Sequence, residues 1–153
     1  MVKHKIQLND RQVKLRANKL VRKTPKLSRQ ILGVLGEAIV ARTNTHYLSG
    51  QVLHRKTGKL AQSVNYKYNN DWSINVGSNV AYAGIHEHGG EIYPRTADAL
   101  RFKTADGWVI TKKVVMPKRP WLAPSVDDIM NSPTAQNIMD RETEKWLNKE
   151  WEK

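Results

Sequence analysis

Two short segments organise this sequence: residues 79–90, NVAYAGIHEHGG, and residues 116–124, MPKRPWLAP. The first segment combines small residues, three adjacent ionisable side chains and a double glycine. Because glycine tolerates positive φ and close backbone approach, this composition predicts a tightly packed turn at an architectural corner. In the second segment Pro117 and Pro120 cannot donate to a strand ladder, so Trp121 projects from a stiffened segment rather than from a strand.

Strand patterns lie on both sides of this corner. Apolar and polar residues alternate over residues 64–68 and again over 72–76, with an Asn-Asn-Asp turn between them. A third strand begins at residues 100–102, an Asp-Gly pair turns it, and residues 108–115 return as a fourth. Alternation with a period of two is typical of half-buried strands. The sequence therefore predicts an antiparallel sheet of about four strands, built from two hairpins.

Helical patterns lie toward both ends of the chain. Asn9 or Asp10 can cap a first, basic helix that ends at Pro25. Thr24 can cap a second helix with Pro25 in its first turn, where the missing N–H costs nothing. The apolar stripe of this second helix consists of Leu27, Ile31, Leu35, Ala38 and Ile39.

Three further features complete the predicted fold: a closely packed face on the second helix, a loop after it and a C-terminal helix. Gly33 and Gly36 each lower helix propensity by about 1 kcal/mol relative to Ala, so another element is expected to approach closely there. Periodicity stops over residues 43–58, which predicts a polar, basic loop. A C-terminal helix is expected over residues 133–153. The predicted fold class is α+β, with N-terminal helices and this C-terminal helix packed on the sheet.

Length and composition favour one domain. The chain has 153 residues, which suits a single domain over 1–153 with a basic helical extension over 1–24. It contains no cysteine, which removes disulfides and thiolate chemistry. No run of about 18 apolar residues occurs, so neither a signal peptide nor a membrane span is expected. A hydrophobic content of 39% with 26% charged residues favours added stability from subunit contacts.

The net charge of +12 is concentrated near the N-terminus. A strongly basic chain is drawn to polyanions by counterion release and long-range steering. Three interpretations are open: a solvated helix face, contact with DNA, or contact with an acidic protein partner. The candidate contact residues are Lys14, Arg16, Lys19, Arg22 and Lys23.

Several motifs together resemble the virion-morphogenesis (tail-completion) proteins of tailed bacteriophages. One is the aromatic-Ala-x-Ile-His-x-x-Gly-Gly turn at residues 82–90, and another is Pro-x-Arg-Pro-Trp-Leu at residues 117–122. Residues 57–64, TGKLAQSV, resemble the Thr-Gly-x-Leu-x-x-Ser segment that precedes the sheet in those proteins. The three motifs span residues 57 to 124 in the order and spacing of the family.

The resemblance implies a non-enzymatic structural protein that assembles as a hexameric ring at the head-proximal end of the tail. Its expected partners are its own copies, the tail tube or terminator and the head connector, with possible passage or contact of DNA and no membrane. The expected location is the tail or neck of the virion, after assembly in the host cytoplasm. Tail completion, tail termination and head–tail connection are not separated by these motifs. The alternative function is a nucleic-acid-binding accessory protein that uses its basic N-terminal helices.

The His86-Glu87-His88 cluster invites a metal or acid–base interpretation, because imidazoles and a carboxylate can ligate zinc when they converge. In an extended chain, however, His86 and His88 face one side and Glu87 the other, and no fourth ligand is evident. The structural alternative is a histidine that packs at the corner and hydrogen-bonds the backbone, beside a Glu87 that pairs with a basic neighbour. We therefore expect no catalytic residues, metal or cofactor, since phosphate-binding loops and nucleophile motifs are also missing from the sequence.

The corner and the proline-rich segment supply the candidate interface. Trp121 has two interpretations, an anchor in a neighbouring subunit or a plug in the core of its own chain. Arg119 is expected to pair with Glu87 or Glu91. The candidate subunit or partner contacts are Tyr82, His86, Glu87, Arg119, Trp121 and Leu122.

Overall fold

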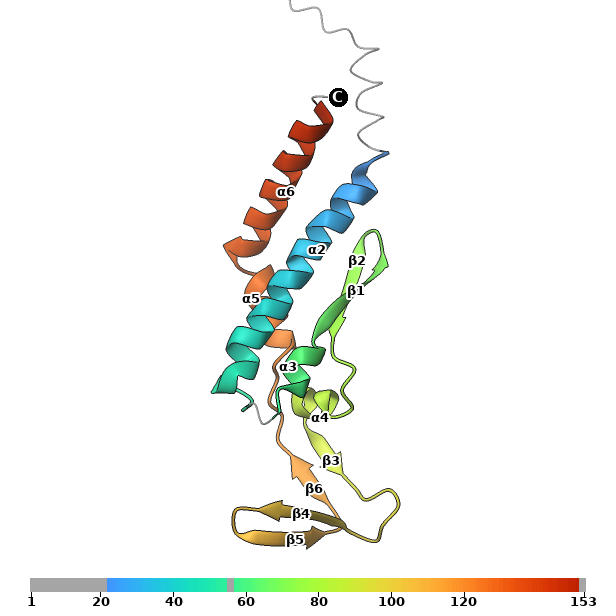
Figure 1. Cartoon of the computed structure of the whole chain (residues 1–153), viewed down its shortest axis with the longest axis vertical. Coiled ribbons are helices and arrows are strands. Elements are labelled where there is room, and N and C mark those ends of the chain that lie inside the picture. Colours follow the sequence, from blue (N-terminus) through green and yellow to red (C-terminus); the bar gives the residue numbers. More distant parts are fainter. Residues whose placement is uncertain (1–21, 55–56, 152–153) are drawn as a thin grey trace, which may run out of the picture.

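The computed structural model describes residues 22–54 and 57–151 (Figure 1). The fold class is α+β, as predicted, with helices toward both ends of the chain and antiparallel strand pairs between them. The first basic helix, expected between Asn9 or Asp10 and Pro25, falls almost wholly outside the described residues. The same is true of Lys14, Arg16 and Lys19.

Helix α2 (Thr24–Arg42) is the central element of the helical body. Pro25 lies in its first turn as expected, but the N-cap residue is Lys23 and no side chain caps the helix. The expected Thr24 cap is therefore wrong, because Thr24 is already the first helical residue. Leu35 and Ile39 are buried on the stripe that the sequence predicted.

The two glycines of α2 mark the place where a hairpin crosses the helix. The hairpin consists of β1 (Asn65–Asn70) and β2 (Ser73–Gly77), paired antiparallel. A Cβ atom on Gly36 would lie 2.6 Å from Cγ of Tyr66, and one on Gly33 would lie 2.5 Å from the Tyr68 hydroxyl oxygen. The expected close approach is confirmed, and the side chains that require it come from β1.

Residues 43–51 are helical, so the loop expected there is wrong. They form a π-helical segment, η1 (Thr43–Gln51), that continues α2 directly. The Thr43 hydroxyl donates to the Ile39 carbonyl at 2.8 Å and lies 2.6 Å from the Ser125 hydroxyl. Gly50, with φ of 121°, interrupts the helical geometry before the chain reaches α3 (Lys59–Ser63). Buried contacts thus stabilise helical backbone that propensity alone does not favour.

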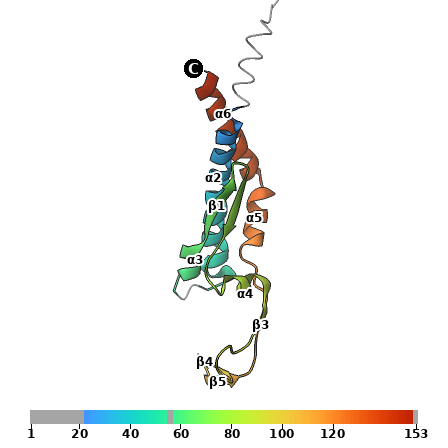
Figure 2. The same ribbon diagram turned by 90° about the vertical axis from the view of Figure 1, so that its right-hand side faces the viewer.

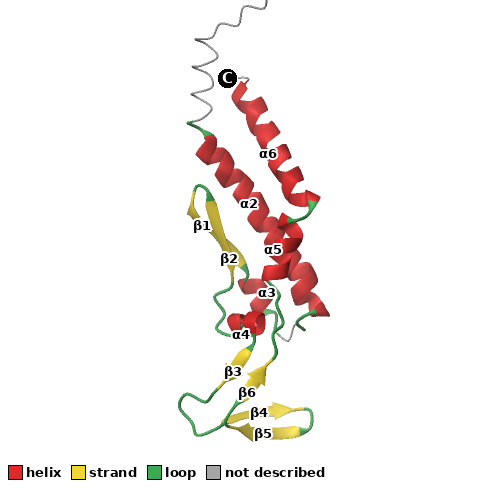
Figure 3. Ribbon diagram, turned by 180° about the vertical axis from the view of Figure 1, so that it is seen from behind, coloured by secondary structure: helices red, strands yellow, loops and turns green. Residues whose placement is uncertain are grey.

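The strands that follow the corner form a separate arm, which we call the β-arm (residues 90–116). Figures 1 and 3 show it at one end of the elongated chain, beyond α4 (Ala83–His88), and Figure 2 shows the same separation from the side. The fourth strand expected over 108–115 is divided between two strand pairs. These antiparallel pairs are β3 (Gly90–Ile92) with β6 (Val114–Met116) and β4 (Leu100–Thr104) with β5 (Gly107–Thr111). The strands of the described chain therefore form three two-stranded sheets.

Two C-terminal helices close the body on the side of α2 opposite the β1–β2 hairpin (Figure 1). Helix α6 (Pro133–Trp151) begins at Pro133, as predicted. Helix α5 (Ala123–Met130) was not expected, because Pro124 favoured an extended segment. The proline instead lies in the first turn of α5, where it leaves no hydrogen bond unmade. Ile129 of α5 and Ile138 of α6 share a buried cluster with Leu35 and Ile39 of α2.

Candidate functional site

The corner is built on a short helix rather than on an extended turn. Residues 83–88 form α4, which ends at Gly89, where φ is 71°. Helical geometry replaces the expected alternation of His86, Glu87 and His88 with steps of about 100° around the helix. His88 is exposed, His86 is half-buried and Glu87 is buried. The corner thus directs the carboxylate of Glu87 into the protein.

Glu87 accepts three hydrogen bonds from consecutive backbone N–H groups. Its carboxylate lies 2.8 Å from the nitrogen of Trp121 and 2.9 Å from those of Leu122 and Ala123. These N–H groups belong to the start of α5, whose own N-cap residue provides no side-chain cap. A carboxylate at this place satisfies donors that a helix leaves free and opposes the positive end of its dipole. The expectation that Glu87 pairs with a basic side chain is therefore wrong.

The same hydrogen bonds determine the protonation state of Glu87. Burial by itself raises the pKa of this carboxyl, but the three backbone donors and the nearby His88 outweigh burial and hold the pKa below its ordinary value of 4.5. Glu87 is consequently ionised at neutral pH. Its charge contributes to the attachment of α5 to α4.

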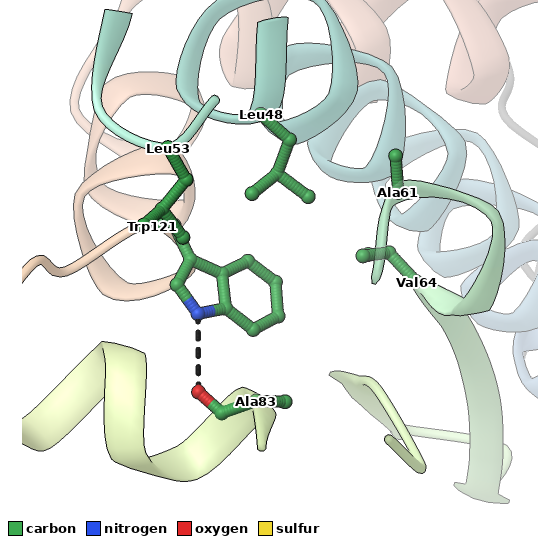
Figure 4. Packing of buried hydrophobic residues seen from close by; sticks show 6 residues of the cluster. All are labelled: Leu48, Leu53, Ala61, Val64, Ala83 and Trp121. Atoms are coloured by element: carbon green, nitrogen blue, oxygen red, sulfur yellow. Dashed lines mark hydrogen bonds between the residues drawn. The ribbon is translucent and has the colours of Figure 1, made fainter. Parts of the chain in front are cut away.

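Trp121 lies in the core of its own chain. It is 2% exposed, and its indole N–H donates to the Ala83 carbonyl at 3.3 Å. Figure 4 shows the ring enclosed by side chains from several elements. These neighbours are Leu48, Leu53, Ala61, Val64 and Ala83. Of the two interpretations of Trp121, the structure supports the plug in the core rather than the intersubunit anchor.

Backbone contacts complete the joint between the two motifs. The Arg119 N–H donates to the His86 carbonyl at 2.8 Å. A Cβ atom on Gly89 would lie 2.8 Å from the Lys118 nitrogen, so only glycine fits there. Directly beyond this contact Gly90 pairs with Met116, where the β-arm begins. The corner and the proline-rich segment are therefore the two halves of one joint, which holds the β-arm to the helical body.

Three of the candidate interface residues lie together on the surface beside this joint. Tyr82, His86 and Arg119 line a pocket of about 570 Å³, and the rings of Tyr82 and His86 meet edge to face at 5.9 Å. The remaining lining residues are Leu48, Leu53, His54, Thr57, Gly58, Lys59, Leu60 and Ala61. The pocket thus has an apolar wall and several basic groups around it.

The ion pair expected for Arg119 is wrong. Glu87 bonds backbone N–H groups, and Glu91 pairs with Lys113 at 2.7 Å. Arg119 is exposed and makes no ion pair with any residue in ranges 22–54 and 57–151. Within those ranges Nδ1 of His86 is buried and has no hydrogen-bond partner.

The structure places two of the candidate basic residues. Arg22 is exposed, whereas Lys23 forms an ion pair with Glu150 near the end of α6. This pair connects the N-cap of α2 to the last turns of α6. Lys23 therefore contributes to packing within the chain, and its charge is partly compensated there.

Sequence reasoning missed the most exposed apolar surface of the chain, which lies on the β-arm. Trp108 is 62% exposed, Ile110 is 68% exposed and Val115 is 63% exposed. Six of the ten large hydrophobic residues that are exposed in the described chain lie between residues 92 and 115. Alternation in the sequence indicated half-buried strands, but it could not show that the covering layer is missing from the single chain.

No cluster of three metal-ligating side chains occurs among the described residues. The helices in that part of the chain are also too short or too polar to cross a membrane. What the described geometry does provide is a buried joint and an exposed apolar arm.

These features define an α+β protein in which two sequence motifs hold a projecting arm to a helical body. The model of the phage virion morphogenesis family matches residues 40–142, and the chain belongs to that family. The match includes the joint, the whole β-arm and helix α5. Searches of curated proteins and of solved structures give no match. Family membership assigns the chain a structural, morphogenetic role in a bacteriophage and associates it with the virion.

Proposed function

We propose that copies of this chain close into a ring of six at the head-proximal end of a phage tail. There the ring completes the tail and makes it competent to join the DNA-filled head. Its partners are the tail tube or terminator on one side and the head connector on the other. The ring is assembled in the cytoplasm of the host and remains in the neck of the virion.

The observation that carries this proposal is the uncovered apolar surface of the β-arm. Contiguous exposed apolar patches are uncommon on monomeric proteins and mark interaction sites. In the arm, more than half of the surface of each of Trp108, Ile110 and Val115 is exposed to solvent. A partner that packs on the arm would cover these side chains. Two-stranded sheets are also marginally stable by themselves in water. If a partner subunit covers the arm on assembly, the apolar side chains are buried and the two-stranded sheets are stabilised.

The joint supports the same proposal because it fixes the arm before assembly. Glu87, Trp121 and Gly89 connect the arm to the body through backbone hydrogen bonds and close packing. A contact that is held in place in the free subunit loses less conformational entropy when it binds. The joint therefore makes a small arm effective as an assembly element.

The function is tested with tails made in the absence of this chain. We expect such tails to reach normal length but to fail to join heads, and we expect purified protein to restore joining. Labelled protein should then be found at the head-proximal tail end by electron microscopy. Normal joining without the protein, or label distributed along the tail, would contradict the proposal.

The net charge of +12 supports the alternative, a nucleic-acid-binding accessory protein. Its test is binding to short duplex DNA at low and high salt by the wild type and by a variant with Lys14, Arg16 and Lys19 changed to Glu. Salt-dependent binding that the variant loses, together with unchanged head joining, would favour the alternative. If the variant loses head joining and the wild type does not bind DNA, contact of these residues with an acidic protein surface would be favoured instead.

A further inference from the structure

We propose that the β4–β5 hairpin of one subunit docks on the outer surface of helix α6 in the next subunit. This inference rests on the proposed ring and names the two surfaces that close it. The occupant of the hairpin surface is thus a second copy of this chain.

The first surface is one face of the β4–β5 hairpin. Arg101 pairs with Ile110 and Lys103 with Trp108 in the antiparallel register, and directly opposed residues point to the same side of a sheet. The guanidinium of Arg101 lies 4.7 Å from the centre of the Trp108 ring, as a shared face requires. We call these four residues the hairpin face. It combines two cations with the two most exposed apolar side chains of β5.

The hairpin face has no cover within the described chain. Trp108 is 62% exposed and Ile110 is 68% exposed, and the sheet that carries them has only two strands. Burial of an aromatic and a branched aliphatic side chain is a strong source of association free energy. Their position beside Arg101 and Lys103 indicates a partner surface that is apolar and acidic.

The second surface is the outer stripe of α6. Asp140, Glu144 and Leu147 follow one another at spacings of four and three residues, which places them on one side of the helix. All three are exposed, whereas Ala135 and Ile138 on the opposite side are buried. We call Asp140, Glu144 and Leu147 the acidic stripe.

Two of the bases of α6 pair with a carboxylate outside the acidic stripe. Arg141 and Lys145 both pair with Glu142, which is itself 4% exposed. Asp140 accepts a hydrogen bond from the neutral side-chain amide of Gln136 at 2.7 Å. The stripe therefore presents two carboxylates and a leucine that is 40% exposed on one side of the helix, whereas the neighbouring bases Arg141 and Lys145 pair with Glu142.

The hairpin face and the acidic stripe are complementary in charge, and both contain exposed apolar side chains. Arg101 and Lys103 complement Asp140 and Glu144, while Trp108 and Ile110 supply the apolar contact for Leu147. The hairpin lies at one end of the elongated chain and the end of α6 at the other (Figure 1). In the proposed ring, each copy uses its hairpin face at one junction and its acidic stripe at the next. The two surfaces produce a head-to-tail contact, which closes into a ring when the rotation between copies permits it.

Charge reversal on each surface tests the contact. One variant carries Arg101→Glu and Lys103→Glu, and the other carries Asp140→Lys and Glu144→Lys. We expect each variant alone to associate at least about tenfold more weakly than the wild type, because like charges would then face each other. An equimolar mixture should recover association, since every junction then joins either two native surfaces or two reversed ones. Thermal unfolding of each variant checks that the exposed substitutions leave the fold intact.

Two tryptophans provide a matched control for the apolar part of the contact. Trp108 and Trp72 are both 62% exposed, but Trp72 lies in the turn of the β1–β2 hairpin. Trp108→Ala should weaken association by about tenfold or more, and Trp72→Ala should leave it unchanged. Equal effects of the two substitutions would overturn the assignment of the hairpin face.

All variants are measured by sedimentation velocity and by restoration of head joining to deficient tails, so that a contact made only on the tail is also detected. The inference would be overturned if the wild type forms rings and the charge-reversed variants associate as strongly as the wild type. It would also be overturned if the equimolar mixture of the two variants does not recover association. Either result would leave the proposed ring itself intact. A wild type that forms no ring in either assay would overturn the proposed function itself. Loss of duplex DNA binding by Arg101→Glu and Lys103→Glu with unchanged association would assign the hairpin face to nucleic acid instead.

Discussion

Glu87 is a buried carboxylate whose charge is compensated by backbone N–H groups rather than by a basic side chain. Removing an ion from water is costly unless hydrogen bonds replace the lost hydration. Three N–H groups at the start of α5 provide this replacement at distances of 2.8 to 2.9 Å. A residue that looked like a candidate metal ligand in the sequence is thus a helix cap supplied from another helix.

Glu87→Gln should lower the free energy of unfolding by at least about 2 kcal/mol. The substitution removes a charged acceptor and directs an amide NH₂ toward backbone donors that remain buried. Urea denaturation at pH 7 measures the change. Glu91→Gln is the matched control, because Glu91 is exposed and its partners among the described residues are Lys113 and Tyr93 at the surface. A loss for Glu91→Gln as large as that for Glu87→Gln would contradict the capping role.

The pH dependence of this variant should differ from that of the wild type. The folded-state pKa of Glu87 lies below the ordinary value of 4.5, so an unfolded chain takes up the proton first as the pH falls. The contribution of Glu87 is present above about pH 4.5 and is lost as the pH falls through the folded-state pKa. Urea denaturation between neutral pH and pH 3 should therefore show a shallower decline for Glu87→Gln. An equal decline for both proteins would contradict the lowered pKa.

Some acid sensitivity should persist in Glu87→Gln because a second buried carboxylate remains. Hydrogen bonds from Gln30, and then from Lys145 and Arg141, lower the pKa of Glu142 to about 2. Its contribution is likewise present above the ordinary value of 4.5 and declines toward pH 2.

Gly89→Ala should destabilise the protein by about 1 to 3 kcal/mol, because φ is 71° there and a Cβ atom would meet the Lys118 backbone. Gly84→Ala is the control within the same short helix. A Cβ atom on Gly84 meets nothing within 4 Å, so that substitution should be neutral or stabilise the helix by up to about 1 kcal/mol. Chemical denaturation of the two variants measures the difference, and similar values would show that the joint tolerates a side chain at Gly89.

At the scale of elements, the segment that holds Trp121 joins the core of the body to the arm. Trp121→Ala should lower the free energy of unfolding by about 3 to 5 kcal/mol, as expected for truncation of a buried tryptophan. Thermal unfolding and oligomer mass are measured on the same sample. A fully stable monomer that no longer assembles would show that Trp121 acts between subunits, contrary to its position in the core.

The sequence predicted elements whose signals are local. The apolar stripe of α2, the start of α6 at Pro133 and both hairpin turns were all recognisable from spacing and turn chemistry. Segment η1 was missed because Thr43, Asn44 and Thr45 favour caps and turns over helix interiors. Its helical form depends on burial against α5, as the contact of Thr43 with Ser125 shows.

The role of Glu87 was not predictable for a related reason. Its partners are backbone groups more than thirty positions away, and backbone donors leave no residue-specific trace in the sequence. The same holds for helix α5, where Pro124 is compatible with both an extended segment and a first helical turn. By contrast, Gly33 and Gly36 predicted a close approach correctly, because only glycine permits it.

At the scale of the whole molecule, the chain consists of a helical body with two buried clusters and an arm that has no core of its own. The family match from residue 40 to residue 142 includes the arm and the joint but not residues 24–39 of α2 or the end of α6. The proposed assembly would explain why an arm with this much exposed apolar surface is attached so firmly, because a neighbouring copy would then complete its stability.

The most direct test of assembly is the mass of the purified protein across the micromolar range, measured by sedimentation and native mass spectrometry with and without tails that lack it. A closed ring predicts a concentration-dependent transition from the monomer to one discrete multiple, expected to be six, with no further growth. Assembly that occurs only on the tail would agree with the same proposal. A monomer at every concentration, both alone and in the presence of tails, would contradict it.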